Sequence, residues 1–65
     1  MTTLTQAIAV PTGSIKQFGP FGPEYEVMEE AQPENARRMA RIVIVRTGEE
    51  LDYPLDAILQ DQEAY

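Results

Sequence analysis

Four consecutive β-branched residues, Ile42 to Val45, constrain this chain more than any other feature of its sequence. Such residues lose rotamer freedom in a helix and favour the extended, pleated backbone of a strand. Gly48 follows soon after and is a poor residue for continuing a helix. We therefore expect Met39 to Arg46 to form the central strand of the fold, because a strand that is apolar on both faces is usually covered on both sides.

Two other segments have the alternation of a half-buried strand. In Glu24 to Glu30, Tyr25 and Val27 point to one face and glutamates to the other, and the proline just upstream favours a strand over the competing helix. Glu50 to Tyr53 alternates in the same way, after a tight turn at Gly48. The sequence thus predicts a three-stranded antiparallel sheet over residues 24–30, 39–46 and 50–53.

A short helix is predicted after the last strand. Pro54 suits the first position of a helix, and Leu55, Ile58 and Leu59 then form an apolar stripe. The helix should cover about residues 55–61 and pack on one face of the sheet, and the tail from Gln60 to Tyr65 should fray. The expected fold class is a small α+β domain that is mainly β.

The N-terminal part of the chain has weaker patterns. Residues 1–13 sustain no period and are predicted to be a flexible arm, with a short helix around Leu4 to Ile8 as the alternative. Residues 14–65 are then a single small β-rich domain. Ser14 to Phe18 is a possible short strand, although Ile15 and Gln17 give it a poor apolar face.

The segment Gly19-Pro20-Phe21-Gly22-Pro23 is predicted to be a stiff loop. Proline lacks the amide hydrogen and restricts the residue before it, so two Gly-Pro pairs cannot continue a helix or a central strand. Phe18 and Phe21 flank and occupy this loop, and we expect the two rings to cap the small core. The alternative is that the loop displays an aromatic knob for docking.

Composition removes most catalytic chemistry. The chain of 65 residues has no cysteine and no histidine, which excludes disulfides, thiolate-bound zinc and imidazole ligands. The one serine, Ser14, has no histidine to activate it, and no calcium-binding or phosphate-binding loop is present. Carboxylates are abundant, but a chain this short has little interior in which to build a cleft. We expect no enzyme activity and no cofactor.

Charge favours a basic partner. The net charge is −6, and from Thr47 onward the chain carries six acids and no base. We therefore predict a small acidic protein-interaction module, antitoxin-like or inhibitor-like, that masks a basic protein. The residues expected to contact the partner are Phe21, Glu49, Glu50, Asp52, Asp56 and Asp61.

Two other functions stay open. The chain could pair with a second copy through a free sheet edge, as a self-associating structural protein. It could also bind nucleic acid through an arginine patch, although the net negative charge argues against this. The patch would consist of Arg37, Arg38, Arg41 and Arg46. Pairing of Arg41 with Glu26 or Glu29 across the ladder is also expected.

Two negative signals concern location. No apolar run approaches the ~20 residues that span a bilayer, and the N-terminus lacks the pattern of a secretory signal. We expect a cytoplasmic protein with no membrane contact.

The run Gly13 to Val27, which contains Phe18-Gly19-Pro20-Phe21-Gly22-Pro23 and Tyr25-Glu26-Val27, resembles a family of short proteobacterial proteins of unknown function. Thr47-Gly48-Glu49-Glu50 and Tyr53-Pro54-Leu55 extend the resemblance over most of Gly13 to Glu63. The resemblance implies a bacterial cytoplasmic protein. It implies no activity, ligand or functional residue.

Overall fold

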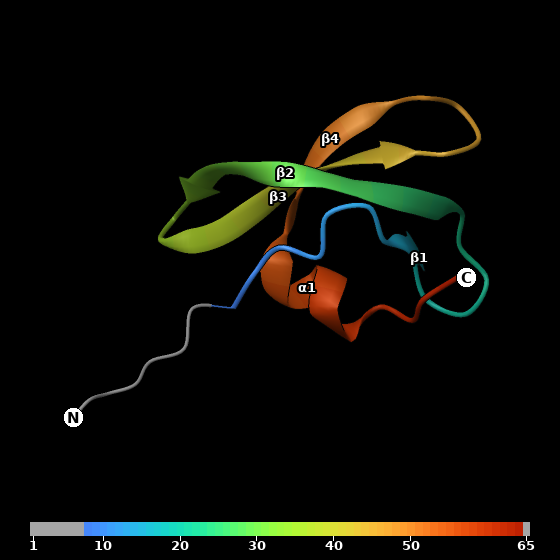
Figure 1. The fold of residues 1–65 in the computed structure, drawn as a ribbon, viewed down its shortest axis with the longest axis horizontal. Helices are drawn as coiled ribbons and strands as arrows, with labels where there is room; N and C mark the ends of the chain where they lie inside the picture. Colours follow the sequence, from blue (N-terminus) through green and yellow to red (C-terminus); the bar gives the residue numbers. More distant parts are fainter. Residues whose placement is uncertain (1–7, 65) are drawn as a thin grey trace.

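The computed structural model describes residues 8–64, which form a four-stranded antiparallel sheet followed by one short helix (Figure 1). The strands follow one another in the order β1-β2-β3-β4, and the helix packs on one face of the sheet. The elements are β1 (Ile15–Gln17), β2 (Glu24–Glu34), β3 (Arg37–Ile44), β4 (Glu50–Pro54) and α1 (Leu55–Gln60). The predicted small, mainly-β fold with a C-terminal helix is confirmed, but the sheet has four strands, not three.

The core lies between α1 and the two central strands. Val27 of β2 pairs with Ile42 of β3, and both side chains are fully buried together with Tyr25. Ile58 of α1 is also fully buried and packs onto this group. Burying each such side chain stabilises the fold by roughly 1.5–3 kcal/mol. The period-two pattern of the sequence therefore identified the faces of the central strands correctly.

The connection between β2 and β3 differs from the prediction. The predicted strands 24–30 and 39–46 leave residues 31–38 as their connection, but β2 continues to Glu34 and β3 begins at Arg37. Asn35 and Ala36 form a two-residue turn with φ angles of 49° and 63°, as a type I′ hairpin requires. Pro33 argued against a strand at this position, because proline cannot donate a ladder hydrogen bond. It lies at a register shift, where a missing ladder hydrogen bond is tolerated. At its other end, β3 stops at Ile44 because Val45 to Thr47 form a turn.

The fourth strand is β1, which pairs with β2 through Ile15↔Glu26 and Gln17↔Glu24. The prediction that the C-terminal tail frays is wrong for the described residues. The Gln17 amide donates to the Gln62 carbonyl (3.1 Å), and the Ala64 amide donates to the Ile15 carbonyl (2.8 Å). The tail thus covers the outer edge of β1. Main-chain groups make these hydrogen bonds, so the pattern of apolar and polar side chains in the sequence does not predict them.

The helix α1 spans Leu55–Gln60, one residue less than predicted. Leu55 and Ile58 are buried, whereas Leu59 is 42% exposed, so only part of the expected stripe faces the core. Within residues 8–64, no helix is long and apolar enough to cross a membrane. The alternative helix around Leu4 to Ile8 lies almost entirely outside the described residues, as does most of the predicted arm. From Val10 onward the described part of that arm contacts the sheet, and the Gly13 amide donates to the Val27 carbonyl (2.8 Å).

Candidate interaction surface

The Gly-Pro loop between β1 and β2 is held by a set of local contacts. The Phe18 amide donates to the Pro23 carbonyl (3.1 Å), which closes the loop. The side-chain amide of Gln17 donates to the carbonyl oxygens of Gly22 (3.1 Å) and Pro20 (3.3 Å). A Cβ atom at Gly22 would collide with the main-chain oxygen of Phe18 and lie 2.6 Å from the Phe18 Cβ. The loop therefore has one tightly packed conformation that needs glycine at this position.

The two phenylalanines of this segment have opposite environments. Phe18 packs against the core, with ring centroids 4.4 Å from Tyr25 and 5.1 Å from Tyr53. Phe21 lies at the tip of the loop and is 95% exposed. The prediction that both rings cap the core is thus wrong for Phe21, because the closed loop turns its side chain outward. A large apolar ring on a fixed loop has the geometry expected of a docking group.

The β3–β4 loop, residues 45–49, lies beside the Gly-Pro loop. The Val45 amide donates to the Glu24 carbonyl (3.0 Å), which joins this loop to the start of β2. The turn is closed by the Gly48 amide, which donates to the Ile44 carbonyl (2.7 Å), with a φ angle of 76° at Gly48. Val45 is consequently 53% exposed instead of lying in the central strand, as the sequence had suggested.

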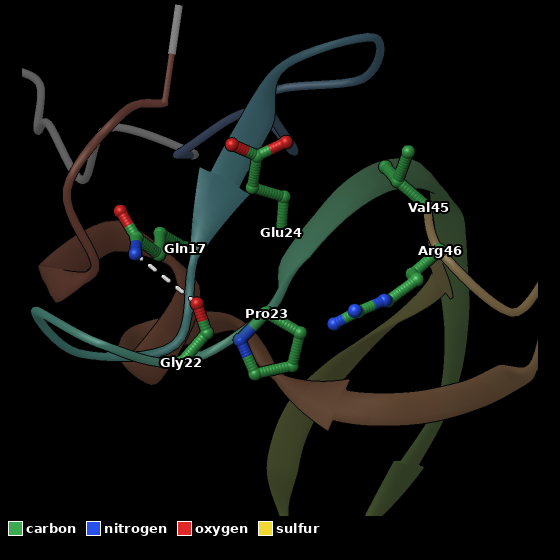
Figure 2. Close-up of a pocket in the computed structure, with 6 residues that line it drawn as sticks. All are labelled: Gln17, Gly22, Pro23, Glu24, Val45 and Arg46. Carbon is green, nitrogen blue, oxygen red and sulfur yellow. Dashed lines mark hydrogen bonds between the residues drawn. The ribbon is translucent and has the colours of Figure 1, made fainter.

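Two shallow depressions separate the loops. One, of about 390 Å³, is lined by Gln17, Pro23 and Arg46, and the arginine extends its guanidinium toward the proline ring (Figure 2). The other, of about 480 Å³, is lined by Phe21 of the Gly-Pro loop and Glu49 of the β3–β4 loop. We call the surface formed by these two loops the loop end. It combines exposed apolar side chains with charges of both signs.

The structure separates the acidic residues that were predicted to contact a partner. Glu49 shares a depression with Phe21, and Glu50 and Asp52 follow directly along β4 as exposed residues. Asp56 lies on α1 and forms an exposed ion pair with Arg37 (2.9 Å). Asp61 lies beyond the helix and accepts a hydrogen bond from the Tyr25 hydroxyl. The structure thus brings together four of the six predicted contact residues on a surface that runs from the loop end onto β4. They are Phe21, Glu49, Glu50 and Asp52.

The Asp61 carboxylate has a structural role that the sequence did not reveal. The Tyr25 hydroxyl donates to Asp61 Oδ2 at 2.6 Å, and Lys16 Nζ donates to the Asp61 carbonyl oxygen at 3.1 Å. Burial of the phenol, followed by the hydrogen bond and charge of Asp61, raises the pKa of Tyr25 far above its usual range. Burial and the same carboxylate also raise the pKa of Tyr53. Asp61 therefore fixes the end of α1 against the aromatic part of the core.

The four predicted patch arginines do not form a common basic surface. Arg38 makes a two-pronged pair with Glu30 (2.8 and 2.9 Å), and these hydrogen bonds lower the pKa of Glu30. Arg41 lies 3.4 Å from Glu29, as expected, and 3.8 Å from Glu50. Arg46 lies in the turn that follows β3. Arg37 lies at the other end of this strand, and the strand from Arg37 to Ile44 is about 23 Å long.

Sequence reasoning missed the environments of two residues near these surfaces, Lys16 and Val45, and it named Arg46 only as part of the arginine patch. Lys16 is only 6% exposed, although its charge suggested a surface residue. Its long stem packs inward while Nζ reaches a carbonyl near the helix end, a combination that no local pattern predicts. For Val45, the Thr47-Gly48 pair was the available signal, because the turn at Gly48 also includes the two residues before Thr47.

Comparison with known proteins places the chain in a family. A family model described as "Family of unknown function (DUF5397)" matches residues 2–65. The chain belongs to this family. An uncharacterized protein of Haemophilus influenzae is 41% identical over 56 residues, which cover 85% of this chain and 89% of the relative. The resemblance to short proteobacterial proteins of unknown function is confirmed, and DUF5397 membership carries no assigned activity or site.

Proposed function

We propose that this chain is a small acidic protein-interaction module that docks on a basic partner protein through the loop end. It would act without a cofactor or catalysis, in the cytoplasm, as an antitoxin-like or inhibitor-like subunit. The exposure of Phe21 carries the proposal. A small protein has few large apolar residues, and this one leaves such a ring 95% exposed on a loop that three hydrogen bonds hold in place.

The energetics favour docking. Transferring a phenylalanine side chain from water to an apolar pocket contributes roughly 1.5–3 kcal/mol, and aromatic anchors dominate the energy of protein interfaces. Because the loop is already ordered, binding would cost little conformational entropy. The ring therefore has the properties of a preorganised anchor.

Charge supports a basic partner. The chain has a net charge of −6, Glu49 lines the same depression as Phe21, and Glu50 and Asp52 follow as exposed residues of β4. A field of this sign accelerates encounter with a positively charged surface and makes the association sensitive to salt. The arginine alternative lacks such support, since three of its four residues are paired with carboxylates.

The test is purification of the tagged chain, at low salt, from the bacterium that encodes it. We compare the wild type with Phe21→Ala and with Leu59→Ala, which removes another exposed apolar side chain, one on α1. A basic protein should co-purify with the wild type and Leu59→Ala, dissociate as salt rises, and bind Phe21→Ala at least tenfold more weakly. Recovery of the same proteins with all three chains, or of no basic protein, would overturn the proposal.

A further inference from the structure

One edge of the sheet is open and the other is closed. Gln62 and Ala64 cover the outer edge of β1 with main-chain hydrogen bonds. In the described chain, β4 forms the opposite edge and no segment pairs with its outer side. An uncovered edge strand presents unpaired N–H and C=O groups, to which another extended chain can add.

The register shows which main-chain groups of β4 point outward. The Ile44 amide donates to the Glu49 carbonyl (2.8 Å), and bonded pairs alternate along an antiparallel ladder. Leu51 and Tyr53, opposite Ile42 and Ala40, therefore bond to β3. Glu50 and Asp52 direct their N–H and C=O groups to the open edge. Pro54 occupies the next outward position, where its missing amide breaks no bond within the sheet.

The side chains of β4 divide between the two faces of the sheet. Leu51 and Tyr53 lie on the face that α1 covers, since their partners Ile42 and Ala40 are in the core. Glu50 and Asp52 lie on the other face, opposite Val43 and Arg41. A strand added at this edge would place alternate residues beside the apolar pair and beside the acidic pair.

We propose that the β4 edge binds an extended segment of the basic partner in which basic and apolar residues alternate. This inference rests on the proposed function and names the second contact of the same interface. The basic residues pair with Glu50 and Asp52, and the apolar residues pack beside Leu51, which is 38% exposed. The β3–β4 loop joins this edge to the loop end, so one partner can occupy both.

The acids argue against a second copy of this chain as the occupant. If two copies paired through antiparallel β4 strands related by a two-fold axis, the same face of each sheet would lie on the same side of the combined sheet. In the registers in which the two strands overlap most, at least one of these acids lies opposite Glu50 or Asp52 of the other copy. Like charges directly opposite one another destabilise a ladder, whereas lysine or arginine at the same positions stabilises it.

The test uses synthetic peptides and amide NMR of the full chain. One peptide alternates lysine with valine, a second of equal charge alternates lysine with proline, and a third alternates glutamate with valine. We expect only the lysine–valine peptide to slow hydrogen exchange at the Glu50 and Asp52 amides, because proline cannot form the ladder. Equal effects of the lysine–proline peptide, or shifts confined to other strands, would overturn the proposal.

Two variants test the position of the charge. Asp52→Lys and Glu34→Lys change the net charge equally, but Glu34 lies in the β2–β3 hairpin and away from β4. Asp52→Lys should weaken lysine–valine binding about fivefold, from one lost attraction and one new repulsion, and Glu34→Lys should change it little. Equal weakening would contradict the edge contact. If partner capture still depends on Phe21 in that case, the proposed function stands and only the edge contact fails. If capture is independent of Phe21 but peptide binding is normal, the edge contact stands and the proposed docking through Phe21 fails.

Discussion

The hydrogen bond between the Tyr25 hydroxyl and Asp61 Oδ2, 2.6 Å long, holds the end of α1 against the sheet. The substitution Tyr25→Phe removes that hydroxyl and leaves the ring, which is fully buried and packs 4.4 Å from Phe18. The change therefore tests the hydrogen bond with little disturbance of the core.

The expected loss follows from the surroundings of the two groups. Hydrogen bonds to a charged group contribute about 1.5–3 kcal/mol. Asp61 is partly exposed, so the lower end, about 1.5 kcal/mol, applies. For a domain of this size that corresponds to a fall of about 6–12 °C in Tm. A chain of 65 residues has a free energy of unfolding of about 3–10 kcal/mol, so the loss is substantial.

The pH dependence gives an independent measurement. Burial and the Asp61 hydrogen bond raise the pKa of Tyr25, so the folded chain retains the phenol proton at pH values where the unfolded chain loses it. The stabilisation is complete below about pH 10 and declines above it, by about 1.4 kcal/mol per pH unit for each such tyrosine. Tyr25→Phe should make this decline shallower, and Tyr53, whose pKa is also raised, should supply the remainder.

Urea unfolding followed by circular dichroism measures these quantities, and Asp61→Asn completes a double-mutant cycle. The two substitutions should be coupled, with a combined loss clearly smaller than the sum of the single losses. Additive losses, or an unchanged alkaline decline in Tyr25→Phe, would refute the assigned role of the hydrogen bond.

Four further changes test the backbone. Ala36→Gly should raise the free energy of unfolding by about 0.5–1 kcal/mol, because Ala36 has a φ of 63° that glycine adopts more easily. Gly48→Ala should lower it by a similar amount, because Gly48 has a φ of 76°. Thermal unfolding measures both changes. Gly22→Ala should destabilise by about 2 kcal/mol or more because the methyl group meets Phe18, with a matching change in the NMR shifts of the loop. Deleting residues 62–65 should uncover the β1 edge, lower Tm and promote association in sedimentation.

The side-chain pattern predicted the central strands because burial there depends on alternation. Tyr25, Val27 and Ile42 were placed on the correct faces, since a one-residue shift would expose all of them. The pattern failed where main-chain groups decide the structure. The strand β1 and the tail pair through N–H and C=O groups, and the Asn35-Ala36 turn lacks the glycine that usually marks a type I′ hairpin.

The candidate surface was predictable only in part. Acid content led to the prediction of Glu49, Glu50 and Asp52 as contact residues. It could not distinguish them from Asp61, whose carboxylate accepts a hydrogen bond within the fold. The environment of Phe21 depends on how the Gly-Pro loop closes. That closure is a three-dimensional property of contacts at Gln17 and Phe18, and the sequence allowed either orientation of the ring.

The most direct test of the account is photo-crosslinking in the living cell, with a benzoyl-phenylalanine at position 21 and, in a separate chain, at position 59. We predict a cross-link from position 21 to one basic protein, absent from position 59 and weakened by Asp52→Lys. Cross-links that are the same from both positions, or that join position 21 only to copies of this chain, would contradict docking of the loop end on a basic partner.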